Sequence, residues 1–214
     1  MGDKHTSANV NVKLMDRGLD RSQTAGTIFS QYSTVKGLSV LDVGCSFGCF
    51  CVHAKLLGAG KVVGIESREP RYSKALENAA AAGVDVEYLN IDFFDYRPSR
   101  KYDLVLLLNV LHHASYPLEM VKRCADACEG DVWVEFATVK ENRFLKRSRI
   151  PKIFGGPLAK LPIVGIGPDE YKTTFYFTKS SFQLIFVKHL KLFKSIDFFP
   201  SDMGSDRLIA KCHV

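Results

Sequence analysis

Two carboxylates near the ends of short apolar runs could bind a nucleoside-type cofactor. Asp42 lies near the end of one run and is followed by a turn of small residues, Gly44, Ser46 and Gly48, which opens a helix. Glu66 ends the next apolar run, 24 residues after Asp42. In parallel α/β proteins an acid at this second position accepts hydrogen bonds from ribose hydroxyls, and the small-residue turn lets the cofactor approach the backbone. The spacing therefore predicts a cofactor pocket between the two runs.

The turn does not fit a dinucleotide cofactor. The motif G-x-G-x-x-G needs glycine at three positions, which are Gly44, Ser46 and Cys49 in this sequence. With one glycine, and with Asp42 two residues before it, the turn favours a ligand that has an ammonium group and no pyrophosphate. S-adenosylmethionine (SAM) is such a ligand. The alternative for an isolated glycine turn is a strand, turn and helix that bind nothing.

Two adjacent histidines follow a third apolar run. This run ends at Asn109, and His112 and His113 come three and four residues later. A neutral imidazole near pH 7 can accept a proton, so a histidine at the mouth of a pocket could act as general base toward a hydroxyl. The alternative role is structural, in which either ring packs beneath the cofactor or caps the next helix. The sequence leaves both roles open.

The composition is that of a globular protein. The chain has 214 residues, of which 46% are hydrophobic and 24% charged, so we expect one domain over residues 1–214. No apolar run reaches the roughly 18 residues needed to cross a bilayer, and the N-terminus lacks the apolar core of a signal peptide. These features predict a cytoplasmic protein without a transmembrane segment. The formal net charge of +6 favours an anionic partner, such as nucleic acid, a phosphorylated metabolite or a membrane surface.

The cysteines do not form a metal-binding pattern. Cys45, Cys49 and Cys51 could suggest an iron–sulfur site, but its third ligand would fall on Val52. Zinc would need a second pair of cysteines or histidines at a suitable spacing. We therefore expect all six cysteines to be buried free thiols and expect no metal site.

Strands and helices alternate at the intervals of a parallel sheet. After an N-terminal arm and helix over residues 1–36, the predicted strands are 38–44, 61–66, 86–91, 103–109 and 131–137, and the predicted helices are 48–57, 70–82 and 117–128. A helix at 179–190 precedes two strands, 192–199 and 206–213, which a tight turn joins into an antiparallel pair. The pattern predicts a doubly wound, mostly parallel seven-stranded α/β sheet whose sites lie at the carboxyl ends of the strands.

Residues 139–177 interrupt this alternation after the fifth strand. A basic segment at 140–152, which includes Arg143 and Arg147, precedes an apolar stretch broken repeatedly by glycine and proline, and aromatic residues that include Tyr176 follow. Such an insertion is longer than an ordinary connection and indicates a lid over the substrate. The basic segment could clamp RNA phosphates, bind a phosphorylated small acceptor, direct the apolar stretch to a membrane surface, or form a solvated charged face.

From about residue 38 onward, the chain resembles class I SAM-dependent methyltransferases with their Rossmann-like fold. The resemblance implies that the glycine turn holds the methionine portion of SAM, although Ser46 stands where glycine is usual. Glu66 then binds the ribose and Asp92 the adenine amino group, with Phe93 beside the ring; Asp95 could replace Asp92, or either could cap the next turn. The implied cofactor-binding residues are Asp42, Gly44, Cys45, Ser46, Gly48, Glu66, Ser67, Asp92, Phe93 and Asn109.

The residues after the fourth strand resemble one branch of that superfamily. The Asn/Asp-Pro-Pro-Tyr/Phe motif of enzymes that methylate exocyclic amines is absent. The pattern from Leu111 to Leu118 is instead similar to the tRNA wobble-uridine carboxymethyl transferase, to quinone-biosynthesis methyltransferases and to small-molecule O- and C-methyltransferases. This resemblance implies a catalytic role for His113, with His112 as the second candidate. Candidate substrate contacts are Tyr116, Arg143, Arg147 and Tyr176.

Three functions remain open from the sequence. The first is methyl transfer from SAM to a hydroxyl or carbon of a small, planar or anionic acceptor. The second is modification of RNA by a methyl or carboxymethyl transferase, which the basic segment would favour. The third is a non-catalytic methyltransferase-like subunit that serves as a binding partner.

Overall fold

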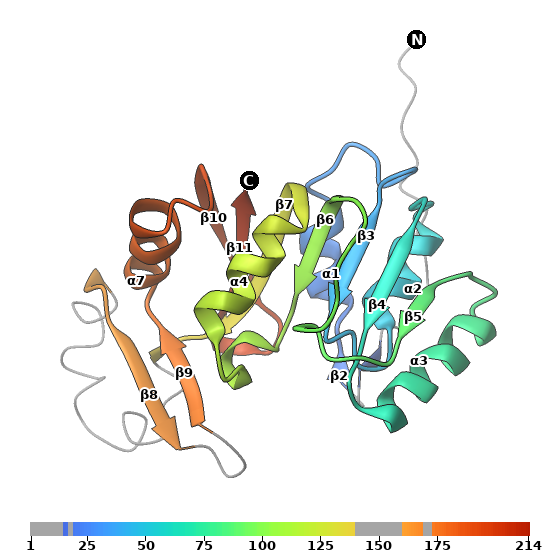
Figure 1. The fold of residues 1–214 in the computed structure, drawn as a ribbon, viewed down its shortest axis with the longest axis horizontal. Coiled ribbons are helices and arrows are strands. Elements are labelled where there is room, and N and C mark those ends of the chain that lie inside the picture. The colour runs from blue at the N-terminus through green and yellow to red at the C-terminus, as the bar shows by residue number, and fades with distance from the viewer. Residues whose placement is uncertain (1–14, 17–18, 140–159, 169–172) are drawn as a thin grey trace.

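The computed structural model describes residues 15–16, 19–139, 160–168 and 173–214 (Figure 1). These residues form a central seven-stranded sheet with the strand order β10-β11-β7-β6-β3-β4-β5. The strands are β3 (Val40–Val43), β4 (Val62–Ile65), β5 (Glu87–Leu89), β6 (Tyr102–Leu107), β7 (Cys128–Ala137), β10 (Ser195–Ser201) and β11 (Gly204–His213).

The sheet is mostly parallel. Strand β3 pairs in parallel with both β4 and β6, β5 pairs in parallel with β4, and β7 pairs in parallel with β6. Strand β11 runs antiparallel to β7, and β10 runs antiparallel to β11. The predicted doubly wound sheet with an antiparallel terminal pair is therefore confirmed. The carboxyl ends of the parallel strands meet along one edge, the lower edge in Figure 1.

Helices cover both faces of the sheet. Helices α1 (Ser22–Phe29), α2 (Cys49–Leu56) and α3 (Glu69–Ala81) share one core with the sheet. Helices α4 (Pro117–Asp126) and α7 (Lys179–Gln183), with a π-helical turn η3 (Leu184–His189) after α7, share the other. Neighbouring strand residues alternate between the two cores, as in β6, where Leu104 faces one and Val105 the other. None of the helices in the described residues is both long and apolar enough to cross a bilayer.

Local sequence signals mark several element boundaries. Gly58 and Gly83 follow helices with left-handed φ angles of 90° and 65°, conformations that glycine adopts without a steric penalty. Pro117 begins α4, where its missing N–H costs nothing. Thr178 and Ser181 form a reciprocal capping box at the start of α7. These predicted starts and stops are confirmed.

Strand β7 begins at Cys128, which is three residues before the predicted strand at 131–137. Gly130 could be taken for a break before the strand, because glycine often interrupts regular elements, but this glycine lies within the strand. A Cβ atom at Gly130 would lie 2.3 Å from the backbone oxygen of Asp103 in the neighbouring strand. Glycine is required here for close approach of two strands and does not end the element.

A short antiparallel pair, β1 (Met15–Asp16) and β2 (Leu19–Asp20), was also not predicted.

The predicted lid contains a small sheet of its own. Strands β8 (Val164–Pro168) and β9 (Thr173–Phe177) pair antiparallel, outside the central sheet. Strand β9 packs against a 3-10 turn, η1 (Leu111–His113), which follows β6. The basic segment with Arg143 and Arg147 lies outside the described residues. Tyr176 is buried on β9.

A buried ionic network joins the N-terminal part of the chain to the sheet. Arg21 precedes α1 and is 2% exposed, and its Nη2 lies 2.9 Å from Oε2 of Glu135, a fully buried residue of β7. Its Nε lies 3.1 Å from Oδ1 of Asp202, in the turn between β10 and β11. The guanidinium also lies 5.5 Å from the ring centroid of Phe50 in α2. This network holds four distant parts of the chain together.

Candidate active site

The glycine turn between β3 and α2 consists largely of left-handed backbone. Gly44, Ser46 and Gly48 have φ angles of 71°, 53° and 73°. The backbone N–H groups of Gly44 and Cys45 both donate to the carbonyl oxygen of Ile65, at 2.8 and 2.9 Å. The turn is therefore anchored to the end of β4, where the predicted ribose-binding acid follows.

Replacing Gly48 with alanine should strain this turn. A Cβ atom there would lie 2.1 Å from the Tyr88 hydroxyl oxygen and 2.8 Å from its ring carbon Cζ. The left-handed φ adds about 1–2 kcal/mol, and the overlap about 1–3 kcal/mol. We expect the free energy of unfolding, measured by chemical denaturation, to fall by about 2–5 kcal/mol. Gly26→Ala in the exposed face of α1, where no atom lies within 4 Å of the new Cβ, should instead stabilise by about 0.5–1 kcal/mol. Equal effects of the two substitutions would contradict this account.

Glu66 lies beside the turn with its carboxylate directed by two backbone groups. It is 5% exposed; one oxygen accepts the N–H of Ser46 at 3.1 Å and the other accepts the N–H of Arg68 at 2.9 Å. An ionised carboxylate has about four acceptor positions. Two of them therefore remain for a pair of vicinal hydroxyls, as the predicted ribose contact requires.

Asp42 supports the turn from within the protein. It is buried, and its Oδ2 lies 3.4 Å from the Cys51 sulfur in α2, which donates to it. Burial raises the pKa of the Cys51 thiol well above its usual value, so the thiol keeps the proton that it donates. Cys45 is also buried. All six cysteines are buried free thiols, as predicted.

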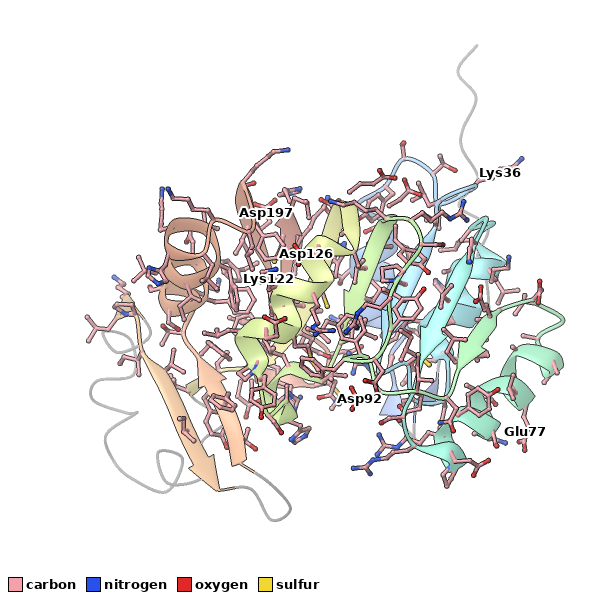
Figure 2. The ribbon with its side chains drawn as sticks, viewed as in Figure 1. Lys36, Glu77, Asp92, Lys122, Asp126 and Asp197 are labelled. Carbon is pink, nitrogen blue, oxygen red and sulfur yellow. The ribbon has the colours of Figure 1, made fainter. Side chains whose placement is uncertain are left out.

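The predicted adenine-binding residues, Asp92 and Phe93, follow β5 at the carboxyl edge of the sheet but differ in burial. Asp92 is exposed (Figure 2), and its Oδ1 accepts the N–H of Phe94 at 2.8 Å. It thus caps the short turn after β5, which is the alternative role considered for it. Phe93 is buried in the core that includes Ile65. Ser67 is exposed next to Glu66.

At the end of β6 the backbone turns through a non-glycine left-handed residue. Asn109 has a φ of 59°, a conformation that asparagine adopts more readily than most residues. Its side-chain oxygen Oδ1 accepts a hydrogen bond from Nη1 of Arg207 in β11. Arg207 is absent from the sequence-based set of site residues because it lies 98 positions from Asn109 and no local motif marks it.

The two histidines differ in exposure. His112 is 1% exposed, and neither of its ring nitrogens has a hydrogen-bond partner among the described residues. Burial, followed by the charges of Arg207 and His113, lowers the pKa of His112 to about 2. The imidazole is therefore neutral at physiological pH. His113 is exposed, and its ring centroid lies 4.0 Å from that of His112. Tyr116 is exposed further along the chain.

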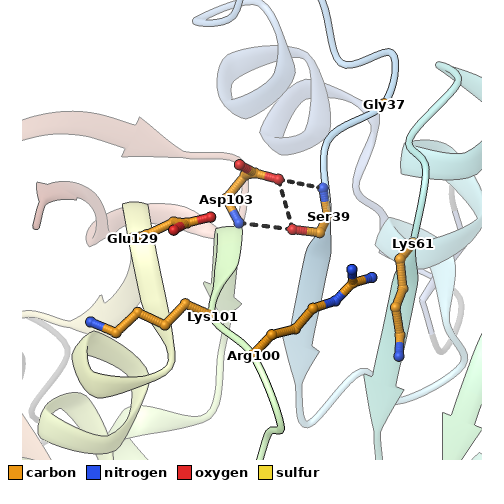
Figure 3. Close-up of a pocket in the computed structure, with 7 residues that line it drawn as sticks. All are labelled: Gly37, Ser39, Lys61, Arg100, Lys101, Asp103 and Glu129. Carbon is orange, nitrogen blue, oxygen red and sulfur yellow. Dashed lines mark hydrogen bonds between the residues drawn. The ribbon is translucent and has the colours of Figure 1, made fainter.

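A hollow at the opposite edge of the sheet does not belong to this site. It lies at the amino ends of the strands and contains none of the predicted site residues (Figure 3). Two hydrogen bonds from Ser39 lower the pKa of Asp103 in its wall. Its lining residues are Gly37, Ser39, Lys61, Arg100, Lys101, Asp103 and Glu129.

The carboxyl edge thus brings together the glycine turn, Glu66, Asn109 and the histidine pair. This arrangement has the features of an α/β domain with a nucleoside-type cofactor site at the carboxyl ends of its strands. A family described as a methyltransferase domain matches residues 16–183, and the chain belongs to this family. The chain accordingly has the methyltransferase domain that the sequence motifs indicate.

Curated relatives and solved structures agree with this assignment. The chain is 30% identical over 145 residues to a ubiquinone biosynthesis O-methyltransferase from Shewanella pealeana. These aligned residues make up 66% of this chain and 57% of the relative. A relative with the same description from Rhodopseudomonas palustris is 28% identical over 51% of this chain and 43% of its own length. The chain therefore matches about half the length of these relatives.

Two solved structures share the fold at low sequence identity. The magnesium protoporphyrin IX methyltransferase from Synechocystis PCC 6803, with S-adenosylhomocysteine (SAH) bound, has a TM-score of 0.64 and 18% identity, covering 89% of this chain and 81% of that one. A SAM-dependent methyltransferase from Mesorhizobium loti has a TM-score of 0.59 and 14% identity, covering 89% and 98%. These similarities establish the methyltransferase fold.

Proposed function

We propose that the protein transfers a methyl group from SAM to a hydroxyl or carbon of a small, planar or anionic acceptor. The observation that carries this proposal is the placement of the histidine pair at the same sheet edge as Glu66 and the glycine turn. The O-methyltransferase description of the curated relatives supports an oxygen acceptor.

The residues of the turn are suited to hold the cofactor. The two remaining acceptor positions of Glu66 suit the ribose hydroxyls. Gly44 and Gly48 keep the turn in its left-handed conformation, packed so closely on Val110 and Tyr88 that a Cβ atom at either glycine would overlap these side chains. When bound, SAM supplies an electrophilic methyl group on a sulfonium. The protein then has to align the acceptor with that methyl group and remove the acceptor's proton.

His113 is suited to remove this proton. Its exposed ring can reach a ligand, whereas His112 is enclosed beneath it. Because His112 stays neutral, it adds no positive charge that would oppose protonation of His113. In this mechanism His112 orients the neighbouring ring and His113 acts as the general base.

Replacing His113 with alanine should lower turnover and leave SAM binding unchanged. Loss of a general base costs about 100-fold in kcat or more, and no cofactor contact is removed. The measurement is methyl transfer from labelled SAM, with SAM affinity determined by calorimetry. His189→Ala in the exposed η3 turn serves as the matched control and should retain full turnover. Unchanged kcat in His113→Ala would end the proposed role.

The overall function can be tested without knowing the acceptor. The protein is incubated with methyl-labelled SAM and a cell extract, and the label is followed in separated small-molecule, lipid and RNA fractions. Label in an acidic or phenolic small molecule would support the proposal. Label in RNA would favour the RNA-modifying alternative and overturn the proposal, and absence of saturable SAM binding would leave only the non-catalytic alternative.

A further inference from the structure

Arg207 reaches across the carboxyl edge of the sheet. In β11 it lies opposite Ala137, the last residue of β7, and its Nη1 donates to Asn109, which follows β6. Strand β7 lies between β11 and β6, and adjacent strands are about 4.8 Å apart. The side chain therefore crosses the end of β7, and its guanidinium lies at the edge where the cofactor turn and the histidines meet.

Buried polar atoms without partners lie on two elements at this edge of the sheet. The two ring nitrogens of His112 and the hydroxyl of Thr174 are buried and have no hydrogen-bond partner among the described residues. Thr174 belongs to β9, which packs against the turn that carries His112. Nearly all buried polar groups in native proteins are hydrogen-bonded. Unsatisfied groups on two adjoining elements therefore indicate a place for a polar ligand.

The charges around Arg207 and His112 favour a negatively charged ligand. An arginine side chain stays protonated at all physiological pH values, and the adjoining His112 is neutral. A fixed cation lowers the free energy of a nearby oxyanion and raises that of a nearby ammonium group. The side of the site facing the acceptor thus discriminates by charge as well as by shape.

We propose that Arg207 determines acceptor specificity: fixed on Asn109, its guanidinium selects acceptors that carry an anionic oxygen and rejects those that carry an ammonium group. The inference rests on the proposed methyl transfer and narrows its acceptor to a hydroxylated small molecule that also carries an anionic oxygen, such as a carboxylate. The hydroxyl proton passes to His113, the hydroxyl oxygen forms the bond to the methyl carbon, and the carbon–sulfur bond breaks with its electron pair on sulfur. SAM thereby becomes SAH.

Two catechols of opposite charge test this proposal. The anionic 3,4-dihydroxyphenylacetate and the cationic dopamine present the same ring and hydroxyls, and their binding to the full chain saturated with SAH can be measured by calorimetry. We expect the wild type to bind the anion at least about tenfold more tightly, a ratio typical of one well-placed charge. In Arg207→Gln this ratio should fall to near one. Arg207→Lys, which keeps the charge, should retain an intermediate preference.

Two controls make the outcomes distinguishable: a second arginine variant, Arg100→Gln, and the affinity of the wild type for SAH. Arg100→Gln removes a charge at the opposite edge of the sheet (Figure 3) and should leave the wild-type ratio unchanged. Equal affinities of the two catechols in the wild type, binding of neither, or an unchanged ratio in Arg207→Gln would overturn the proposal. If Arg207→Gln does not fold, the wild-type and Arg207→Lys ratios still decide it. If the proposed function is wrong, the wild type should instead fail to bind SAH.

Discussion

Replacing Glu66 with alanine is expected to weaken SAM binding by roughly 10²–10⁴-fold. The substitution removes the acceptor for two ribose hydroxyls, and a hydrogen bond to a charged group contributes about 1.5–3 kcal/mol. Two such bonds amount to about 3–6 kcal/mol, and each 1.4 kcal/mol is about tenfold in affinity. The loss extends to the turn itself, because the N–H groups of Ser46 and Arg68 lose their partner. Calorimetric titration with SAM measures the effect.

Two further variants make this prediction specific. Glu66→Gln keeps one carbonyl oxygen as an acceptor, so its affinity should lie between those of the wild type and Glu66→Ala. Glu77→Gln, which changes an exposed side chain of α3 (Figure 2), should bind SAM as the wild type does. A dissociation constant for Glu66→Ala within twofold of the wild-type value would refute the ribose contact.

Much of the sheet could be predicted because its signals are local. Gly58 and Gly83 end helices by a backbone conformation that depends on one residue, and Pro117 starts a helix for an equally local reason. The apolar run that became β6 is buried on both faces, a property of the run itself. Periodicity within single segments was therefore enough to establish the order of elements, and the order established the fold.

Residues with two physical uses could not be assigned from their type. Gly130 suits both a break between elements and close contact between strands, and only its neighbour Asp103 decides between them. An aspartate after a strand, such as Asp92, suits both a ligand contact and a cap for the following turn. The hydrogen bond of Asp92 to Phe94 satisfies the second use. The surroundings of each residue, which the sequence does not contain, made the difference.

Contacts between distant segments were also beyond the sequence. Arg207 meets Asn109 only because β11 and β6 lie on either side of β7. Arg21 and Glu135 are 114 positions apart, and they meet only because the fold places the residue before α1 next to β7. Neither arginine has a neighbouring motif that distinguishes it from an arginine on the surface. The strand order of the folded sheet is therefore needed before the charges near the site can be identified.

Replacing Arg21 with methionine is expected to lower the free energy of unfolding by about 3–5 kcal/mol, the cost of removing one partner of a buried ion pair. Glu135 is fully buried, so its carboxylate would lose a charged partner at 2.9 Å without gaining access to water. Asp202 would lose its contact with the same guanidinium. Urea denaturation measures the change through the midpoint and its slope.

A second substitution separates the lost ion pair from lost packing. In the double variant Arg21→Met/Glu135→Leu the uncompensated charge is removed, so part of the lost stability should return, as it does when a buried ion pair is replaced by apolar groups. Lys74→Met breaks an exposed ion pair with Glu77 and should not shift the midpoint measurably. If Arg21→Met unfolds at the wild-type midpoint, Arg21 does not hold the segment before α1 to the sheet. If it is destabilised but Glu135→Leu restores nothing, the cost arises from lost packing on Phe50 rather than from the buried charge.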